Sequence, residues 1–185
     1  MTYKKITGSI GAIVLLALIS APALAHSDGD DDGEERNSSQ AVRTELRGFQ
    51  EVPVISTTGR GSFRARIGNN ESTIEFALSY ENLEGNVAAA HIHLAQKGVN
   101  GGIVIHLCGT GGKPACPGTT AGELSGVLTS TDVVEAFIPG STPPATQGVA
   151  AGELNEVIKA IRAGKTYVNV HSSKFPGGEC RGQVR

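Results

Sequence analysis

The sequence contains no tryptophan, and its aromatic residues amount to only 4% of the 185 residues. A hydrophobic core must therefore be built from valine, isoleucine, leucine and alanine side chains. The chain is nevertheless long enough for one domain with a substantial core. Glycine is abundant at 25 residues, and many of the apolar runs are short. This combination predicts an all-β protein with many turns.

The sequence also lacks a strong excess of charge of either sign. Its formal net charge is −2, and six carboxylates lie close together between His26 and Glu35. Without these six carboxylates and without Lys4 and Lys5, the remaining chain has a formal charge of +2. A nearly neutral domain gives no reason to expect nucleic-acid binding.

No apolar run is as long as the roughly 20 residues that a membrane-spanning helix needs. At the N-terminus, Lys4 and Lys5 precede the apolar stretch Ile10–Ile19, and Ala23-Leu24-Ala25 follows it. This order is typical of a secretory signal peptide, here residues 1–25, which is cleaved after Ala25. We therefore expect a secreted or periplasmic protein with no stable membrane anchor after cleavage.

The next segment, residues 26–40, is acidic, has little to bury and is predicted to be disordered. Two sharper interpretations compete with this one. Asp28-x-Asp30-x-Asp32-Gly33 matches the first half of an EF-hand calcium loop, but Ser39 stands where a bidentate glutamate is needed. A mature chain that begins at His26 can also chelate copper through its terminal amine and imidazole. A solvated tail is the simplest of the three interpretations.

From residue 41 to residue 185 the chain has the pattern of a folded β domain. Apolar and polar residues alternate over short stretches, which is typical of half-buried strands. Phe63, Ala65 and Ile67, for example, share one face of a stretch whose other face carries Arg64 and Arg66. The predicted strands cover residues 42–52, 59–67, 72–80, 87–94, 103–108, 122–129, 167–171 and 180–185.

Two short helices are predicted outside the sheet. Thr131 or Asp132 can cap the first, and Glu135 completes a capping box if Asp132 is the cap. The second helix spans Glu153–Ala163, carries its apolar residues on one stripe and ends before Gly164.

Three cysteines in an exported chain permit one disulfide and leave one thiol over. Cys108 and Cys116 are the preferred pair because they flank a flexible, glycine-rich loop. A bond from Cys180 to either of them is the alternative, and the sequence alone does not assign the pairing. Export makes a disulfide of some kind the expectation.

Four histidines lie in the domain, namely His91, His93, His106 and His171. Each falls in a predicted strand, on the face opposite most of the apolar residues, so all four are expected on the outside of the sheet. The two imidazoles of a His-x-His strand are roughly 7 Å apart. One metal ion can join them if a third imidazole arrives from a neighbouring strand. Neutral imidazole suits copper and zinc, and no carboxylate accompanies these histidines to hold a harder cation.

The competing interpretation treats the histidines as ordinary polar residues on a solvated or loop-covered face. Among their neighbours, Tyr167 and Asn169 are expected to make structural hydrogen bonds. Glu179 beside Arg181 is a candidate acid in a site, but the simpler expectation for the two residues is an exposed pair or a turn anchor. The chain has no Gly-x-Ser-x-Gly elbow and no phosphate-binding loop, so no catalytic residue is predicted.

Several segments resemble the chordin-type (CHRD) domain family. The resemblance covers about residues 42–185, and its C-terminal motif is the specific part. It implies an exported, β-rich domain but no established biochemical role. The family usually has an aliphatic residue in place of Cys180, so the resemblance raises the expectation of a local use for that thiol. The matching segments are Ala89-Ala90-His91-Ile92-His93, Leu124 to Gly126, Gly164 to His171, and Phe175-Pro176-Gly177-Gly178-Glu179-x-Arg181-Gly182-Gln183.

A more distant similarity links the chain to copper/zinc superoxide dismutases. These enzymes carry a His-x-His strand and a late Gly-Arg-Thr-Leu-Val-Val-His strand, to which residues 164–171 are similar. The similarity implies that His91, His93 and His171 are copper ligands and that Arg181 matches the late arginine of the dismutases. Their zinc-ligand loop has no counterpart here apart from His106, which argues against efficient dismutation.

We therefore expect an all-β protein, an antiparallel Greek-key β-sandwich of immunoglobulin-like or superoxide-dismutase-like type, with one or two short peripheral helices. The leading functional hypothesis is an exported binding module for a protein or an extracellular polymer, with copper or zinc bound through surface histidines. The alternative is a copper-dependent redox enzyme that uses the same ligands.

Overall fold

The structure is a computed structural model that describes residues 40–185. The predicted signal peptide and the greater part of the acidic segment, with its calcium and copper alternatives, lie outside the described residues. None of the described helices is long and apolar enough to cross a membrane.

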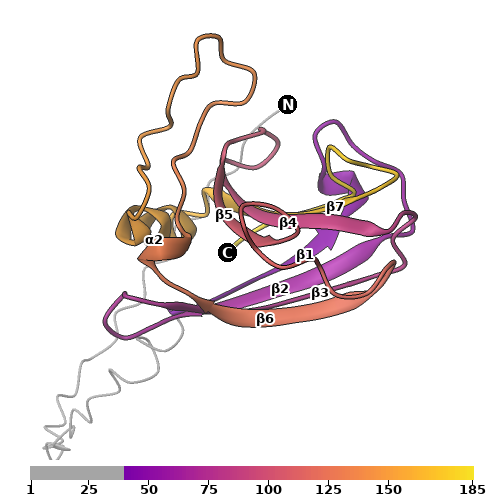
Figure 1. The fold of residues 1–185 in the computed structure, drawn as a ribbon, viewed down its shortest axis with the longest axis horizontal. Coiled ribbons are helices and arrows are strands. Elements are labelled where there is room, and N and C mark those ends of the chain that lie inside the picture. The colour runs from indigo at the N-terminus through magenta and orange to yellow at the C-terminus, as the bar shows by residue number, and fades with distance from the viewer. Residues whose placement is uncertain (1–39) are drawn as a thin grey trace, which may run out of the picture. The chain divides into compact units, whose positions relative to one another are not determined.

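Eight antiparallel strands form one hydrogen-bonded sheet with the strand order β5-β4-β7-β8-β1-β2-β3-β6 (Figure 1). The sequence therefore predicted the fold class correctly, and the bounds of β4 and β5 agree with it residue for residue. The strands are β1 (Ala41–Arg47), β2 (Arg60–Ile67), β3 (Ile74–Glu81), β4 (Val87–Leu94), β5 (Ile103–Cys108), β6 (Gly122–Leu128), β7 (Thr166–Ser172) and β8 (Cys180–Gln183).

The sheet curls so that its two halves form the two layers of the fold. Figure 1 shows β4, β5 and β7 lying over β2, β3 and β6, with β8 and β1 joining the halves through the continuous ladder. Apolar side chains from both halves point into the space between them and are almost fully buried there. Examples from the two layers are Phe63, Ile67, Ile92 and Val168. Alternation within the strands thus gives the sheet an apolar inner face and a polar outer face.

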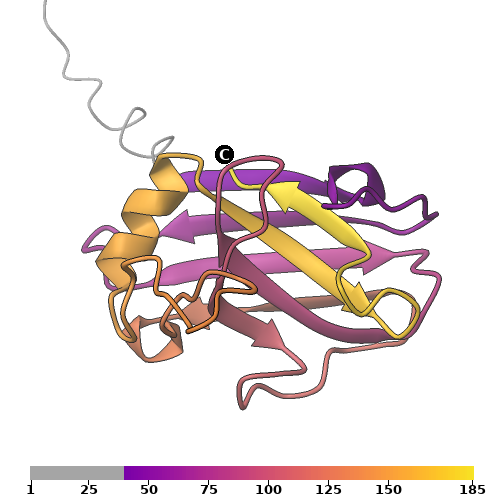
Figure 2. The ribbon, with the colours of Figure 1, turned by 90° about the horizontal axis from the view of Figure 1, so that it is seen from above.

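The helical elements are short and lie beside the sheet. Helix α2 (Leu154–Arg162) confirms the second predicted helix, and its buried stripe packs against one end of the core (Figure 2). The first predicted helix is only a 3-10 turn, η2 (Ser130–Asp132), and Thr129 caps it instead of Thr131 or Asp132. A further 3-10 turn, η1 (Gly48–Gln50), interrupts the first predicted strand, so β1 ends at Arg47.

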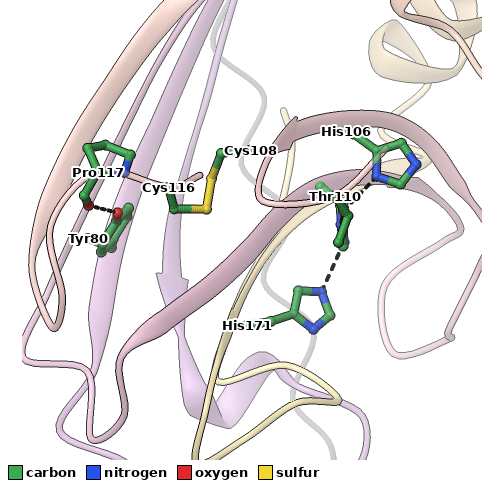
Figure 3. The surroundings of a disulfide bond; sticks show 8 residues. Tyr80, His106, Cys108, Thr110, Cys116, Pro117 and His171 are labelled. Carbon is green, nitrogen blue, oxygen red and sulfur yellow. Dashed lines mark hydrogen bonds between the residues drawn. A yellow bond between two sulfur atoms is a disulfide. The ribbon is translucent and has the colours of Figure 1, made fainter. Parts of the chain in front are cut away.

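One disulfide joins Cys108 and Cys116 and closes the loop that follows β5 (Figure 3). The preferred pairing from the sequence is therefore confirmed, and the alternative through Cys180 is wrong. Cys180 is a buried free thiol on the inner face of β8. Burial raises the pKa of this thiol to about 12, so at neutral pH it packs as a small apolar residue.

Loss of the disulfide is expected to lower the free energy of unfolding by about 2.5 kcal/mol, because the bond closes a loop across a sequence separation of 8. The variant Cys108→Ala/Cys116→Ser and the reduced wild-type protein should give the same urea midpoint. The reductant should leave the double variant unchanged, since its remaining thiol is not bonded. A loss of less than about 1 kcal/mol would contradict the loop-closure argument.

Candidate metal centre

The strand register brings the four histidines to one region of the outer sheet face. Strand β4 lies between β5 and β7, and His91 pairs with His106 on one side and with Asn169 on the other. His93 pairs with Tyr167, and His171 pairs with Ala89, two residues before His91. Because these pairs share a face, all four imidazoles lie on the side of the sheet opposite the apolar core.

Three of the imidazoles converge on one point. One ring nitrogen from each of His91, His93 and His171 lies within 4.8 Å of the others. His106 does not belong to this group of three. Its ring packs edge-on against that of His91 at a centroid distance of 4.9 Å. We call His91, His93 and His171 the histidine triad.

The triad lies on the outer face, but most of it is not at the protein surface. His91 is 5% exposed and His93 is 9% exposed, while His171 is half-buried. The expected surface location is therefore wrong for His91 and His93. Loop segments that carry Gly101, Thr110 and Pro176 lie against the rings, and alternation along a strand contains no information about such loops.

Hydrogen bonds to backbone carbonyls fix the protons of two triad rings. Nδ1 of His93 donates to the carbonyl of Gly101 at 3.0 Å, and Nδ1 of His171 donates to the carbonyl of Pro176 at 2.9 Å. A neutral imidazole has a single N–H, so Nε2 of each ring carries a lone pair. That of His93 has no partner among the described residues, and that of His171 faces Nδ1 of His91. Metal-binding histidines are oriented in this way, with the second nitrogen donating to a carbonyl or carboxylate.

Nε2 of His93 is the triad nitrogen that is buried without a hydrogen-bond partner among the described residues. Buried polar atoms are rarely left unpaired, and an orphan nitrogen indicates strain, a catalytic role or an absent ion or water. Here the orphan belongs to a ring whose other nitrogen is already held in the orientation that a metal ligand needs. The residues therefore fit a bound transition-metal ion.

The electrostatics of the triad keep its rings neutral. Burial lowers the pKa of His91 to about 3, with smaller contributions from the other histidines. Burial likewise lowers the pKa of His93 to about 4, although its bond to Gly101 opposes the shift. Burial also lowers the pKa of His171. Neutral imidazole is the form that binds metal, so no proton has to be displaced at neutral pH to free the lone pairs of His93 and His171.

The donor set is composed entirely of nitrogen. Within the described part of the chain, no aspartate, glutamate or cysteine joins the triad. Calcium and magnesium prefer oxygen ligands, whereas imidazole suits copper and zinc. The sequence prediction that no carboxylate accompanies the histidines therefore holds for the triad.

Arg181 lies in the same outer layer, but it is not an exposed residue. Its side chain is 2% exposed, lies over the ring of Tyr167 at 3.4 Å and donates to Asn100 and Val99. The other neighbour of Tyr167 is His93, whose ring is nearly parallel at 4.7 Å. Since β8 and β4 flank β7 on opposite sides, Arg181 and His93 stack on the two sides of one tyrosine ring.

Glu179 is also buried, so the predicted exposed Glu179–Arg181 pair is wrong. Its Oε1 accepts hydrogen bonds from the hydroxyl of Thr57 at 2.6 Å and from the backbone N–H of Glu84 at 2.7 Å. The alternative prediction of a turn anchor is confirmed, because Glu179 joins two loops to the start of β8. Both residues are enclosed by loop segments, which hold Glu179 through Thr57 and Glu84 and hold Arg181 through Val99 and Asn100.

Glu51 belongs to the layer around the triad, and the sequence did not indicate it. Its Oε1 accepts a hydrogen bond of 2.6 Å from the side-chain amide of Asn169, the cross-strand partner of His91. Burial raises the pKa of Glu51 to about 7, although the positive charge of Arg181 lowers it in part. Gly178 lies so close that an added Cβ would be 2.7 Å from Oε1 of Glu51. The predicted structural roles of Asn169 and Tyr167 are confirmed by their hydrogen bonds to Glu51 and Gly101.

Comparison with known proteins gives one match. The family model described as CHRD domain matches residues 42–184, which is most of the described chain. No significant match was found among curated proteins or among solved structures, so the likeness to superoxide dismutases gains no support from these comparisons. The matched region contains the whole outer layer, including the triad, Arg181 and Glu51. The chain belongs to the CHRD domain family.

Proposed function

We propose that this protein is an extracytoplasmic binding module that holds one copper or zinc ion through His91, His93 and His171. The observation that carries the proposal is the convergence of three neutral imidazoles on one point, with the buried Nε2 of His93 left without a partner. Three nitrogen donors without a carboxylate form a site for a transition metal and not for a hard cation.

The distances support a coordination site. Nδ1 of His91 and Nε2 of His171 are 3.1 Å apart. Two ligands at about 2.0–2.1 Å from a tetrahedral zinc ion are separated by roughly 3.3 Å. An ion can therefore bridge these two nitrogens with little movement, whereas the widest separation in the triad, up to 4.8 Å, has to shorten for all three to bind it. The carbonyls of Gly101 and Pro176 already supply the outer hydrogen bonds that orient two of the rings.

Three observations support export. Residues 1–25 have the order of a signal peptide, and the domain contains a disulfide, which is typical of an oxidising compartment. Membership of the CHRD family points the same way. We propose that the mature chain begins at His26 in the periplasm or outside the cell. Its partner there is a protein or an extracellular polymer.

The test is a metal analysis of exported protein purified without an affinity tag. After exposure to copper and to zinc in turn, we expect about one equivalent of one of them to remain bound after desalting. Less than about a tenth of an equivalent of either metal would overturn the proposal. Stoichiometric copper together with superoxide turnover would instead establish the alternative, a copper-dependent redox enzyme with the same ligands.

A further inference from the structure

Thr110 connects the triad to the fourth histidine. Its hydroxyl oxygen is 2.6 Å from Nε2 of His91 and 2.9 Å from Nδ1 of His106. Figure 3 shows Thr110 beside His106, in the loop that the Cys108–Cys116 disulfide closes. The next residue, Gly111, passes so close that an added Cβ would be 2.3 Å from the His106 ring. The loop therefore hydrogen-bonds to the rings of His91 and His106 and packs closely against the second of them.

The direction of each hydrogen bond in this chain follows from one carbonyl. Because Nδ1 of His171 donates to Pro176, its Nε2 can only accept, and Nδ1 of His91 must be the donor to it. Nε2 of His91 is then an acceptor, so the Thr110 hydroxyl donates to it, and Nδ1 of His106 in turn donates to Thr110. In the metal-free protein, every donor in this series of hydrogen bonds therefore points away from His106 and towards the triad.

This arrangement is the wrong one for a metal ligand at His91. The nitrogen of His91 that faces the triad, Nδ1, carries the proton, and a metal needs its lone pair. A neutral His91 can bind through Nδ1 only if its proton is on Nε2, where it would donate to Thr110. The hydroxyl proton of Thr110 would then be available to Nδ1 of His106, and donation to that nitrogen reverses the whole series of hydrogen bonds.

We propose that Thr110 and His106 are positioning residues that set the tautomer of His91, and that their hydrogen bonds reverse direction when a metal ion enters the triad. This inference rests on the proposed function. His91 releases its Nδ1 proton to solvent and receives the Thr110 proton on Nε2. Thr110 receives the Nδ1 proton of His106, and solvent supplies a proton to Nε2 of His106. The three side chains thus hold the same number of protons before and after, and His91 remains neutral.

The location of the two residues suits this role. Thr110 is exposed and His106 is half-buried on the edge strand β5, so solvent can exchange protons at the outer end of the chain. His91 itself is almost fully buried and has no other described partner for Nε2. A hydroxyl is the one group that can donate to His91 in one state and accept from it in the other.

The test is to record the tautomers by NMR of protein labelled with ¹⁵N in histidine, before and after addition of Zn(II) or of Cu(I) under anaerobic conditions. Long-range ¹H–¹⁵N correlations distinguish Nδ1–H from Nε2–H in each ring. We expect His106 to change from Nδ1–H to Nε2–H on metal addition, although it is not a ligand. We also expect Thr110→Val to uncouple the two sites and to weaken metal binding by about 10-fold. Thr110→Ser, which keeps the hydroxyl, should behave like the wild type.

The outcomes separate this inference from the function on which it rests. If metal addition shifts the ¹⁵N resonances of the triad while His106 keeps its tautomer, the proposed reversal of the hydrogen bonds is wrong and the metal site stands. The same conclusion follows if Thr110→Val retains the coupled change at His106. If neither ion shifts the ¹⁵N resonances of the triad, the proposed function fails, and the proposed reversal of the hydrogen bonds fails with it.

Discussion

Replacement of His93 by alanine is expected to lower the affinity of the domain for copper or zinc by at least about 100-fold, more than the loss of an outer hydrogen bond would cost. His93 supplies the one triad nitrogen that is buried and unpartnered, and its other nitrogen is held by Gly101. With only His91 and His171 left, two ligands remain of the three. A competition titration against a chelator of known affinity measures the change.

Two control variants make this result interpretable. His93→Phe keeps an aromatic ring stacked on Tyr167 but removes the nitrogens, so it should lose metal as His93→Ala does while keeping more stability. His106→Ala removes an imidazole that lies outside the triad but bonds to Thr110, so its loss of affinity should not exceed the roughly 10-fold expected for Thr110→Val. Equal losses in His106→Ala and His93→Ala would show that the triad is not the binding site.

The outer layer explains why His93 is held so firmly. Its ring is stacked on Tyr167, Tyr167 is covered by the guanidinium of Arg181, and Arg181 is bound by Val99 and Asn100. The loop of these last two residues also carries Gly101, the partner of His93. One loop therefore orients the ligand directly and also through the stacked rings. This preorganisation of His93 would remove the entropic cost of ordering that ligand when a metal ion binds.

Local alternation was sufficient to predict most of the fold. The alternation of Val168 and Val170 with Asn169 and His171 predicts a half-buried β7. The two valines do face the core, but the outer face is covered as well, so His171 is the only residue of β7 that is partly exposed. The shared outer face of the histidines follows from the same argument. The Cys108–Cys116 pairing was preferred because the two cysteines flank a flexible, glycine-rich loop, and the structure confirms it, although the sequence alone left Cys180 open as a partner.

Long-range packing was not predictable in this way. The single curled sheet depends on the pairing of β1 with β8, the first strand with the last, which no local pattern encodes. The burial of Arg181 and Glu51 results from loops that fold back over the outer face, and these loops have no periodicity. Glu51 lies near the end of the predicted strand 42–52, and nothing in that pattern indicated that its carboxylate lies beside Asn169.

In the absence of metal, acidification from pH 6.5 to pH 5 is expected to destabilise the domain, because the folded protein keeps His91 and His93 neutral. Their pKa values are about 3 and about 4 in the folded state, against about 6.5 in an unfolded chain. At pH 5 the unfolded chain binds nearly two protons that the folded chain does not bind, and at pH 6.5 it binds one, because each unfolded imidazole is then half-protonated. Averaged over this range, these two residues contribute a loss of about 2.2 kcal/mol for each pH unit of acidification. His106 and His171, whose pKa values are also lowered by burial, act in the same direction.

Glu51 opposes this loss of stability on acidification, so a variant that lacks its carboxyl group provides a matched comparison. Its folded pKa of about 7 lies above the ordinary value of 4.5, so the folded protein binds a proton that the unfolded chain lacks between these limits. Averaged over this range, its contribution rises by about 1.2 kcal/mol for each pH unit of acidification, and the net loss from Glu51, His91 and His93 is about 1 kcal/mol per unit. Glu51→Gln removes the opposing group and should double that slope, whereas His93→Phe should reduce it to nearly zero. Urea unfolding in a metal chelator at half-unit intervals between pH 5 and 6.5 measures all three slopes. A Glu51→Gln slope equal to that of the wild type would mean that Glu51 is ionised in the folded protein, and that Arg181 and Asn169 outweigh the cost of its burial.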